Sequence, residues 1–173
     1  MYYGNIKHFD SVDGPGVRVT LFVSGCTNAC EGCQNPETWD FHYGKEFDDD
    51  AKEDIIKALE PSYITGLTLC GGEPWEPQNQ KDLVEFLKHL KELYPNKSIW
   101  SYTGFVFEKD LLEGQRKHTE YTDDMLKCID VLIDGPFMLC QRNLNLKYRG
   151  SNNQRLIDVQ KSLETKTVVE IEE

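Results

Sequence analysis

The chain has 173 residues, of which 19 are lysine or arginine and 30 are aspartate or glutamate, for a formal net charge of −11. This acidic balance argues against a general binder of nucleic acids or of membrane surfaces. No run of about 18 apolar residues predicts a membrane span, and the N-terminal MYYGNIKHFD lacks the apolar stretch of a secretory signal. We therefore expect one cytoplasmic domain over residues 1–173, without a nucleic-acid or membrane partner.

Short apolar segments alternate with helical ones along the chain. Runs rich in β-branched and apolar residues predict strands at 17–24, 63–70, 97–104 and 130–134, with 154–159 and 166–172 as later candidates. Apolar residues at helical spacing predict helices at 48–60, 78–94 and 122–129. This alternation is typical of βα units around a parallel sheet. Because a closed barrel takes about 250 residues, we expect an α/β fold with an incomplete βα barrel and a curved, mostly parallel sheet.

Three cysteines follow the first predicted strand within eight positions. SGCTNACEGC places Cys26, Cys30 and Cys33 in the spacing C-x₃-C-x₂-C. Thiolates bind iron–sulfur clusters as well as zinc. Three thiolates leave one iron of a [4Fe–4S] cluster open to a substrate, much as catalytic zinc sites keep one position open. The alternative is a zinc site whose fourth ligand lies elsewhere, for example His42 or Cys70.

A glycine-rich loop, GGEPWEP, follows the second predicted strand. The carboxyl ends of parallel strands meet at one edge of a sheet, so we expect this loop beside the cysteine loop. Gly71 and Gly72 permit close backbone approach, although an ordinary turn would also use them. In the cysteine loop, the backbone groups of Gly32, Cys33 and Gln34 are candidates to contact a ligand on the open iron.

The flanking motifs carry a resemblance to a known family. SVDGPGVRVTLFVSGC, CEGCQNPETW and LCGGEP are similar to the glycyl-radical-enzyme activating proteins of the radical S-adenosylmethionine superfamily. DVLIDGPF and YRGSNNQRLIDV resemble the branch that activates anaerobic ribonucleoside-triphosphate reductase. Many radical S-adenosylmethionine enzymes carry an aromatic residue before the third cysteine, where this chain has Gly32. Cys70 stands where serine is common.

The resemblance implies a [4Fe–4S] cluster on Cys26, Cys30 and Cys33, with S-adenosylmethionine on the open iron. The second loop would cradle the methionine end of that ligand, with Glu73 as the acceptor for its ammonium group. The enzyme would cleave S-adenosylmethionine reductively and place a glycyl radical on the large chain of the reductase. A low-potential electron donor such as flavodoxin would supply the electron. No side-chain general acid or base is assigned.

Basic residues gather near the C-terminal end of this acidic chain, in the order Arg142, Lys147, Arg149 and Arg155. Such residues could simply form a polar loop. The functional interpretation is that they dock the partner reductase, chiefly through Arg149 and Arg155.

Two alternatives to the whole hypothesis stay open. One is an activase of another glycyl radical enzyme, such as pyruvate formate-lyase. The other is a non-catalytic iron–sulfur or zinc protein.

Overall fold

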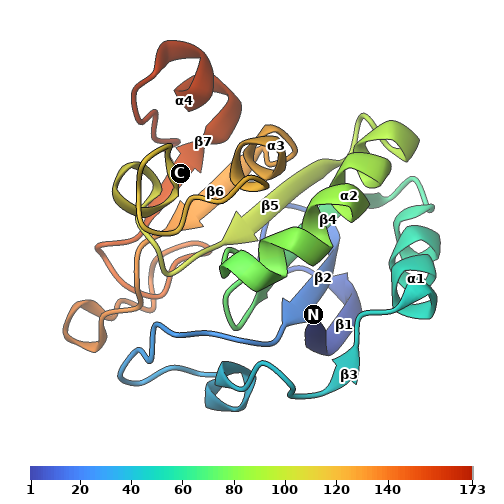
Figure 1. Cartoon of the computed structure of the whole chain (residues 1–173), viewed down its shortest axis with the longest axis horizontal. Coiled ribbons are helices and arrows are strands. Elements are labelled where there is room, and N and C mark those ends of the chain that lie inside the picture. Colours follow the sequence, from blue (N-terminus) through green and yellow to red (C-terminus); the bar gives the residue numbers. More distant parts are fainter. Residues whose placement is uncertain (173) are drawn as a thin grey trace.

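The computed structural model describes residues 1–172, which form an α/β fold around one mixed sheet (Figure 1). Within this part of the chain the strand order is β3-β1-β2-β4-β5-β6-β7. The strands are β1 Tyr2–Asp10, β2 Val17–Val23, β3 Lys45–Glu46, β4 Ile64–Gly71, β5 Ser98–Tyr102, β6 Val131–Asp134 and β7 Arg155–Asp158. The α-helices are α1 Asp49–Leu59, α2 Pro77–Leu93, α3 Thr122–Lys127 and α4 Val159–Thr165. Short 3₁₀-helices lie at Pro36–Trp39 and Leu139–Gln141, and a π-helical turn lies at Phe107–Leu111.

The middle of the sheet is parallel, and its edges are antiparallel. Strands β2, β4, β5 and β6 pair in parallel, with Leu21 opposite Leu69 and Thr68 opposite Trp100. At one edge β1 pairs with β2 and β3 in antiparallel fashion, and at the other β7 pairs with β6 in the same way. The α/β class and the parallel central sheet are therefore confirmed, whereas the antiparallel edges were not expected.

The two faces of the sheet carry different side chains because successive strand residues alternate between faces. The helix-covered face holds the main core, in which Leu21, Leu69 and Ile99 pack with residues of the helices. Figure 1 shows α1, α2 and α3 on the near side of the sheet. The opposite face carries a smaller aromatic and aliphatic cluster around Trp100 and Ile133. That second face is the one on which the candidate site lies.

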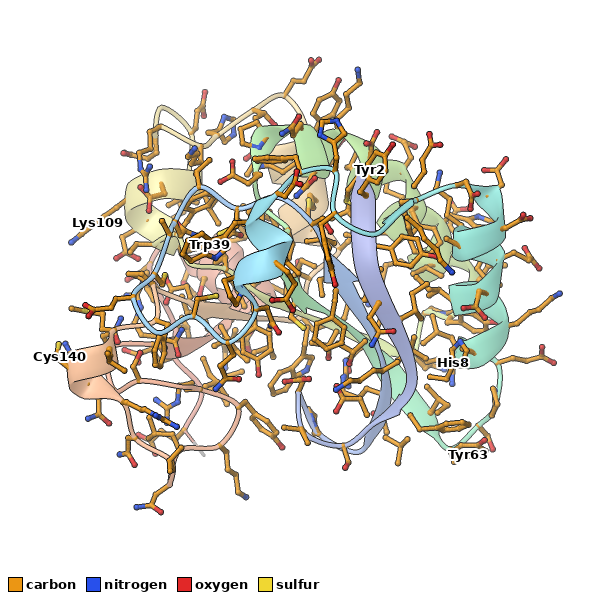
Figure 2. All side chains as sticks on the ribbon, turned by 90° about the horizontal axis from the view of Figure 1, so that it is seen from below. Tyr2, His8, Trp39, Tyr63, Lys109 and Cys140 are labelled. Atoms are coloured by element: carbon orange, nitrogen blue, oxygen red, sulfur yellow. The ribbon has the colours of Figure 1, made fainter. Side chains whose placement is uncertain are left out.

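Two terminal segments differ from the sequence-based expectation. The strand β1, which contains Tyr2 and His8 (Figure 2), was not predicted, because this strand near the edge of the sheet has many exposed side chains and lacks an apolar run. The predicted strand at 166–172 is wrong. Helix α4 follows β7 directly and ends at Thr165, and the next residue, Lys166, adopts a left-handed conformation. The chain then returns along β7 with a single isolated bridge, from Ile157 to Glu170, instead of a ladder.

Arg18 joins three of the parallel strands, β2, β4 and β5. Its guanidinium is fully buried and donates to Thr68 Oγ1, Ser98 Oγ and the carbonyl of Leu67, each at 2.9 Å. Burial lowers the pKa of Arg18 to about 10. The arginine therefore belongs to the polar interior that holds β2, β4 and β5 together.

Among the described helices, none combines the length and apolar character that crossing a membrane would need.

Candidate functional site

A cavity of about 550 Å³ opens on the face of the sheet opposite the helices. This volume lies within the usual range of small-molecule sites, about 300–1,000 Å³. Its walls come from the cysteine loop, the loop after β4, the end of β5 and the segment 135–154. Segments that are far apart in the sequence thus meet at the carboxyl edge of the parallel strands, where the sequence predicted the site.

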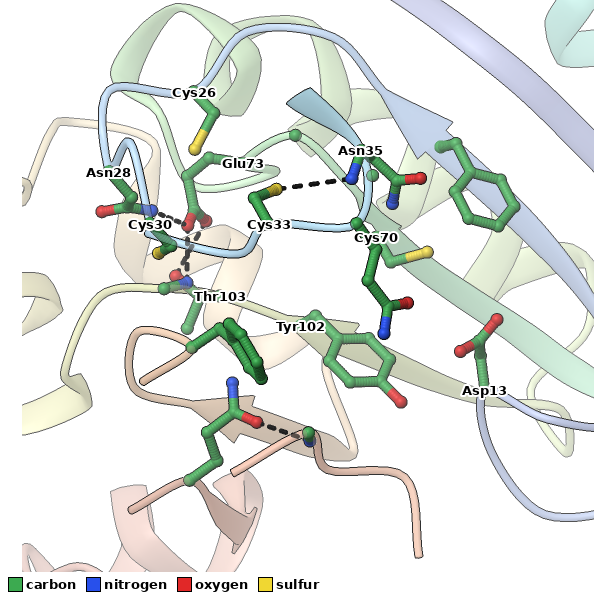
Figure 3. Close-up of a pocket in the computed structure, with 18 of the residues that line it drawn as sticks. Asp13, Cys26, Asn28, Cys30, Cys33, Asn35, Cys70, Glu73, Tyr102 and Thr103 are labelled. Carbon is green, nitrogen blue, oxygen red and sulfur yellow. Dashed lines mark hydrogen bonds between the residues drawn. The ribbon is translucent and has the colours of Figure 1, made fainter. Parts of the chain in front are cut away.

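All three clustered cysteines line this cavity. Cys26, Cys30 and Cys33 are half-buried free thiols on the loop that follows β2. In Figure 3 their sulfur atoms surround the same part of the cavity, next to Glu73. The loop bends back on itself through positive φ angles, 103° at Gly25, 47° at Ala29 and 76° at Gly32. A side chain at Gly25 would place its Cβ 2.1 Å from the Phe41 ring, so this turn requires glycine.

The donor set fits a cluster held from one side. Within residues 1–172, no three histidine, cysteine, aspartate or glutamate side chains lie close enough together to hold a single metal ion. Cluster thiolates bind different irons, so they need to face a common space and not a common point. Cys26, Cys30 and Cys33 meet that requirement. Of the two residues considered as a fourth zinc ligand, Cys70 lines the cavity, whereas the His42 side chain is 81% exposed.

Burial favours the protonated form of two of the three thiols, Cys26 and Cys30. Burial is the main cause that raises the pKa of Cys26 to about 11, with the negative charges of Glu73 and Glu76 adding to it. Burial also raises the pKa of Cys30, against a backbone hydrogen bond from Phe137. The Cys33 sulfur accepts a hydrogen bond from the backbone N–H of Asn35 at 3.4 Å. Since only thiolates bind metal, loading the site would release protons.

Glu73 lies at the centre of the site and is 1% exposed. Its Oε1 accepts hydrogen bonds from Asn28 Nδ2 at 2.9 Å and from the Gly104 backbone N–H at 2.6 Å. Its Oε2 accepts from Thr103 Oγ1 at 2.8 Å and from the Trp75 backbone N–H at 3.0 Å. Burial raises the pKa of Glu73 to about 7, although these donors favour the charged form. The carboxylate thus joins the cysteine loop to the end of β5.

The two glycines before Glu73 are required by close packing of the chain on itself. Gly71 has a φ of 102°, and a Cβ there would lie 2.7 Å from the backbone of Val23. A Cβ on Gly72 would lie 2.7 Å from the Thr38 carbonyl oxygen. Both glycines also line the cavity, as the sequence predicted. They let the loop after β4 sit against the end of β2 and against the return of the cysteine loop.

The other predicted contact residues divide between the cavity and its surroundings. Gln34 lines the cavity together with Cys33. Gly32 is exposed and lies outside the described lining; a Cβ on it would be 3.1 Å from Leu139 Cδ1 and 3.4 Å from the Phe137 ring. The segment after β6 therefore occupies the space beside Gly32 where a side chain would project. The ligand contact of the Gly32 backbone stays a prediction.

The two arginines predicted to dock a partner occupy different environments. Arg149 lines the cavity, and its Nη1 donates to the Gln154 carbonyl at 3.3 Å. Arg155 forms a two-pronged ion pair with Asp134, at 2.9 and 2.6 Å, and its Nη2 also reaches Glu108 at 2.8 Å. Asp134 is 1% exposed, so Arg155 neutralises a buried acid between β6 and β7. Hydrogen bonds from Arg155 also hold the pKa of Glu108 below its usual value against burial.

Several cavity residues were not singled out by the sequence, although Asp13, Phe137 and Tyr148 stand within the motifs that carry the resemblance. Tyr102, Phe137 and Tyr148 form aromatic parts of the wall, and Asp13 lies at its far end. The hydroxyl of Tyr102 donates to the Tyr148 carbonyl at 2.5 Å, which joins the end of β5 to the 135–154 segment. Burial raises the pKa of Tyr102 well above its usual value. Only the position of Tyr102 at a strand end could have indicated it.

Comparison of the sequence with known proteins shows the family of this chain. Residues 12–157 match the family described as 4Fe-4S single cluster domain. An anaerobic ribonucleoside-triphosphate reductase-activating protein of Enterobacteria phage T4 is 42% identical over 158 residues, covering 90% of this chain and 93% of the relative. The protein of that name from Haemophilus influenzae is 44% identical over 147 residues, covering 84% and 90%. The one from Escherichia coli K12 is 36% identical over 156 residues, covering 89% and 96%. This chain therefore belongs to the family of anaerobic ribonucleoside-triphosphate reductase-activating proteins.

Proposed function

We propose that this protein cleaves S-adenosylmethionine at a [4Fe–4S] cluster and generates a glycyl radical on anaerobic ribonucleoside-triphosphate reductase. The observation that carries the proposal is that three free thiols from one loop line the same cavity as the Gly-Gly-Glu loop. The family match and the names of the relatives support it. We further propose that residues 1–173 form a single radical S-adenosylmethionine domain whose sheet is an incomplete barrel.

Cys26, Cys30 and Cys33 would hold the cluster, which when bound supplies one electron for reductive cleavage of a carbon–sulfur bond in S-adenosylmethionine. The loop presents these thiols to the cavity and leaves the remaining side open to a ligand. Glu73 is buried and the thiols are half-buried, which would limit the access of water to the reacting region. The protein thus orients and shields reactive groups, and the cofactors carry the chemistry.

The methionine end of S-adenosylmethionine would bind at the loop after β4. In this proposal Gly71 and Gly72 shape the wall, and Glu73 accepts the ammonium group. Four protein donors already contact the Glu73 carboxylate, so the ammonium would share it with them. Of these donors, the side-chain amide of Asn28 is the best placed to move away from Glu73 when the ligand binds, because Asn28 lines the cavity. Gly32, Cys33 and Gln34 would contact the ligand from the cysteine loop.

The glycine-bearing segment of the reductase would enter the open side of the cavity. Tyr102, Phe137 and Tyr148 offer it an apolar wall that would protect a radical from solvent. Arg149 lies on this wall and Arg155 is engaged with Asp134, so of the two predicted docking residues Arg149 is the better placed to contact an entering segment. A low-potential donor such as flavodoxin and a cytoplasmic location stay predictions.

The relatives' names favour the reductase over another glycyl radical enzyme as the target. The test is anaerobic reconstitution with iron and sulfide, followed by reduction in the presence of S-adenosylmethionine. We expect 5′-deoxyadenosine by chromatography and, with the purified reductase, a glycyl radical by electron paramagnetic resonance. Cys26→Ala should lose iron and both products, whereas Cys128→Ala, which alters a buried thiol outside the cavity, should keep them. Stoichiometric zinc without iron, or a radical on pyruvate formate-lyase alone, would overturn the proposal.

A further inference from the structure

Thr27, the residue directly after Cys26, is held by a buried carboxylate at the start of α2. Its hydroxyl donates to Glu76 Oε1 at 2.6 Å, and its backbone N–H donates to the same oxygen at 3.3 Å. Glu76 is 3% exposed and immediately precedes Pro77, the first residue of α2. Its own carbonyl accepts hydrogen bonds from the first turn of that helix. The contact therefore ties the cysteine loop to a rigid helix end.

One cation opposes the charge of Glu76. Lys117 Nζ lies 3.9 Å from Glu76 Oε2, and the two side chains are 18% and 4% exposed. The ammonium group also sits 5.1 Å from the centroid of the Phe105 ring, a cation–π arrangement. Because both charges are largely removed from solvent, each acts on its surroundings with little screening.

The charge of Glu76 lies beside the peptide that follows Cys26. The Thr27 backbone N–H, which donates to Glu76 Oε1 at 3.3 Å, belongs to the peptide bond between Cys26 and Thr27. The Glu76 carboxylate thus both holds the Cys26–Thr27 segment by hydrogen bonds and places a negative charge beside it. Reduction potentials of iron–sulfur clusters follow the net charge and hydrogen bonding around them.

We propose that Glu76 is a positioning residue of the cysteine loop, and that the Glu76–Lys117 pair sets the reduction potential of the bound cluster. This inference rests on the proposed function, because it assumes that Cys26, Cys30 and Cys33 hold a [4Fe–4S] cluster. A negative charge at Glu76 opposes the arrival of an electron, and the positive charge of Lys117 favours it. Thr27 acts as the tether through which Glu76 holds the loop.

The first test removes the negative charge of Glu76 and the positive charge of Lys117 in separate variants. Glu76→Gln keeps an oxygen that accepts from Thr27 but loses the charge, so the midpoint potential of the cluster should rise. Lys117→Gln leaves Glu76 without its counter-charge, so the potential should fall. Glu92→Gln and Lys161→Gln make the same changes of net charge at exposed positions on α2 and α4, and should leave the potential unchanged. The measurement is a redox titration followed by electron paramagnetic resonance.

Thr27 provides a second test that does not alter charge. Thr27→Val should release iron to a chelator faster than wild type, and Thr27→Ser, which keeps the hydroxyl, should restore the wild-type rate. Wild-type potentials in both charge variants, or shifts in the same direction, would overturn the electrostatic part. A wild-type rate of iron release in Thr27→Val would overturn the tether. A wild-type protein that holds no cluster would instead overturn the proposed function.

Discussion

Asn28 donates its side-chain amide to Glu73 Oε1 at 2.9 Å, and this hydrogen bond joins two loops that are 45 residues apart in the sequence (Figure 3). Asn28 stands between the first two cysteines, and Glu73 follows the Gly71–Gly72 pair at the end of β4. The contact makes the geometry of the thiols depend on the loop proposed to bind S-adenosylmethionine. Changes at either residue should therefore affect ligand binding more than the assembly of the sheet.

Replacing Glu73 should weaken the binding of S-adenosylmethionine. Glu73→Gln removes the charge that would accept the ammonium group, and a charge-assisted hydrogen bond is worth about 1.5–3 kcal/mol. We expect the affinity to fall on the order of tenfold or more. Calorimetry on the reconstituted protein measures this, with iron content determined on the same samples. Unchanged affinity at full iron content would remove Glu73 from the ligand site.

Enlarging Gly104 should disturb the same contact from the side of β5. A Cβ on Gly104 would lie 2.3 Å from Asn28 Nδ2 and 3.4 Å from Glu73 Oε1, so Gly104→Ala should push the amide away from the carboxylate. We expect weaker S-adenosylmethionine binding. Gly114→Ala is the control, because a Cβ there meets open space and costs only the strain of a φ of 85°, about 1–2 kcal/mol. Equal affinities in the two variants would contradict the prediction.

The two arginines should give different phenotypes. Arg155→Ala leaves Asp134 as an uncompensated buried charge, so unfolding should occur at lower denaturant concentration, with a loss of about 3 kcal/mol. Arg149→Ala should instead slow glycyl radical formation on the reductase, and added salt should narrow its gap to wild type. Cleavage of S-adenosylmethionine without the reductase should change little. Equal loss of both activities in Arg149→Ala would place this arginine at the ligand instead of the partner.

The Asp10–Asp13 pair should make the stability of the metal-free protein depend on pH. Burial, helped by the charge of Asp10, raises the pKa of Asp13 to about 7, so folding retains a proton that the unfolded chain releases near 3.8. Stability should therefore fall as pH rises from about 4 to about 7. Hydrogen bonds from Asp13, Val12 and Thr20 lower the pKa of Asp10 to about 2 against burial, so its contribution is lost only as pH falls from 3.8 toward 2.

Asp13→Asn isolates the contribution of Asp13, because the amide resembles the protonated acid and does not titrate. Urea unfolding between pH 4 and pH 8 should show a smaller decline in stability for this variant than for wild type. Asp40→Asn removes an exposed carboxylate and should keep the wild-type decline. Parallel curves for wild type and Asp13→Asn would show that Asp13 does not hold the proton.

The parallel centre of the sheet and the proximity of the two loops could be predicted from residue patterns along the chain. Buried strands such as β2 and β4 are rich in β-branched and apolar residues, and parallel pairing then brings their carboxyl ends together. Cys26, Cys30 and Cys33, and the Gly71–Gly72 pair, could thus be assigned to one cavity before any side chain was placed. These inferences succeeded because spacing along a short segment decides them.

The edges of the sheet and the partners of the polar groups could not be predicted in this way. The exposed strand β1 lacks an apolar pattern. The antiparallel direction of β7 depends on how the preceding segment approaches the free edge of β6. Several contacts join segments that are distant in the sequence. Examples are the hydrogen bond from Asn28 to Glu73, the hydrogen bond from Thr27 to Glu76 and the ion pair of Arg155 with Asp134. Such contacts follow from the three-dimensional course of the backbone, because local periodicity encodes which face is buried but not which polar groups meet.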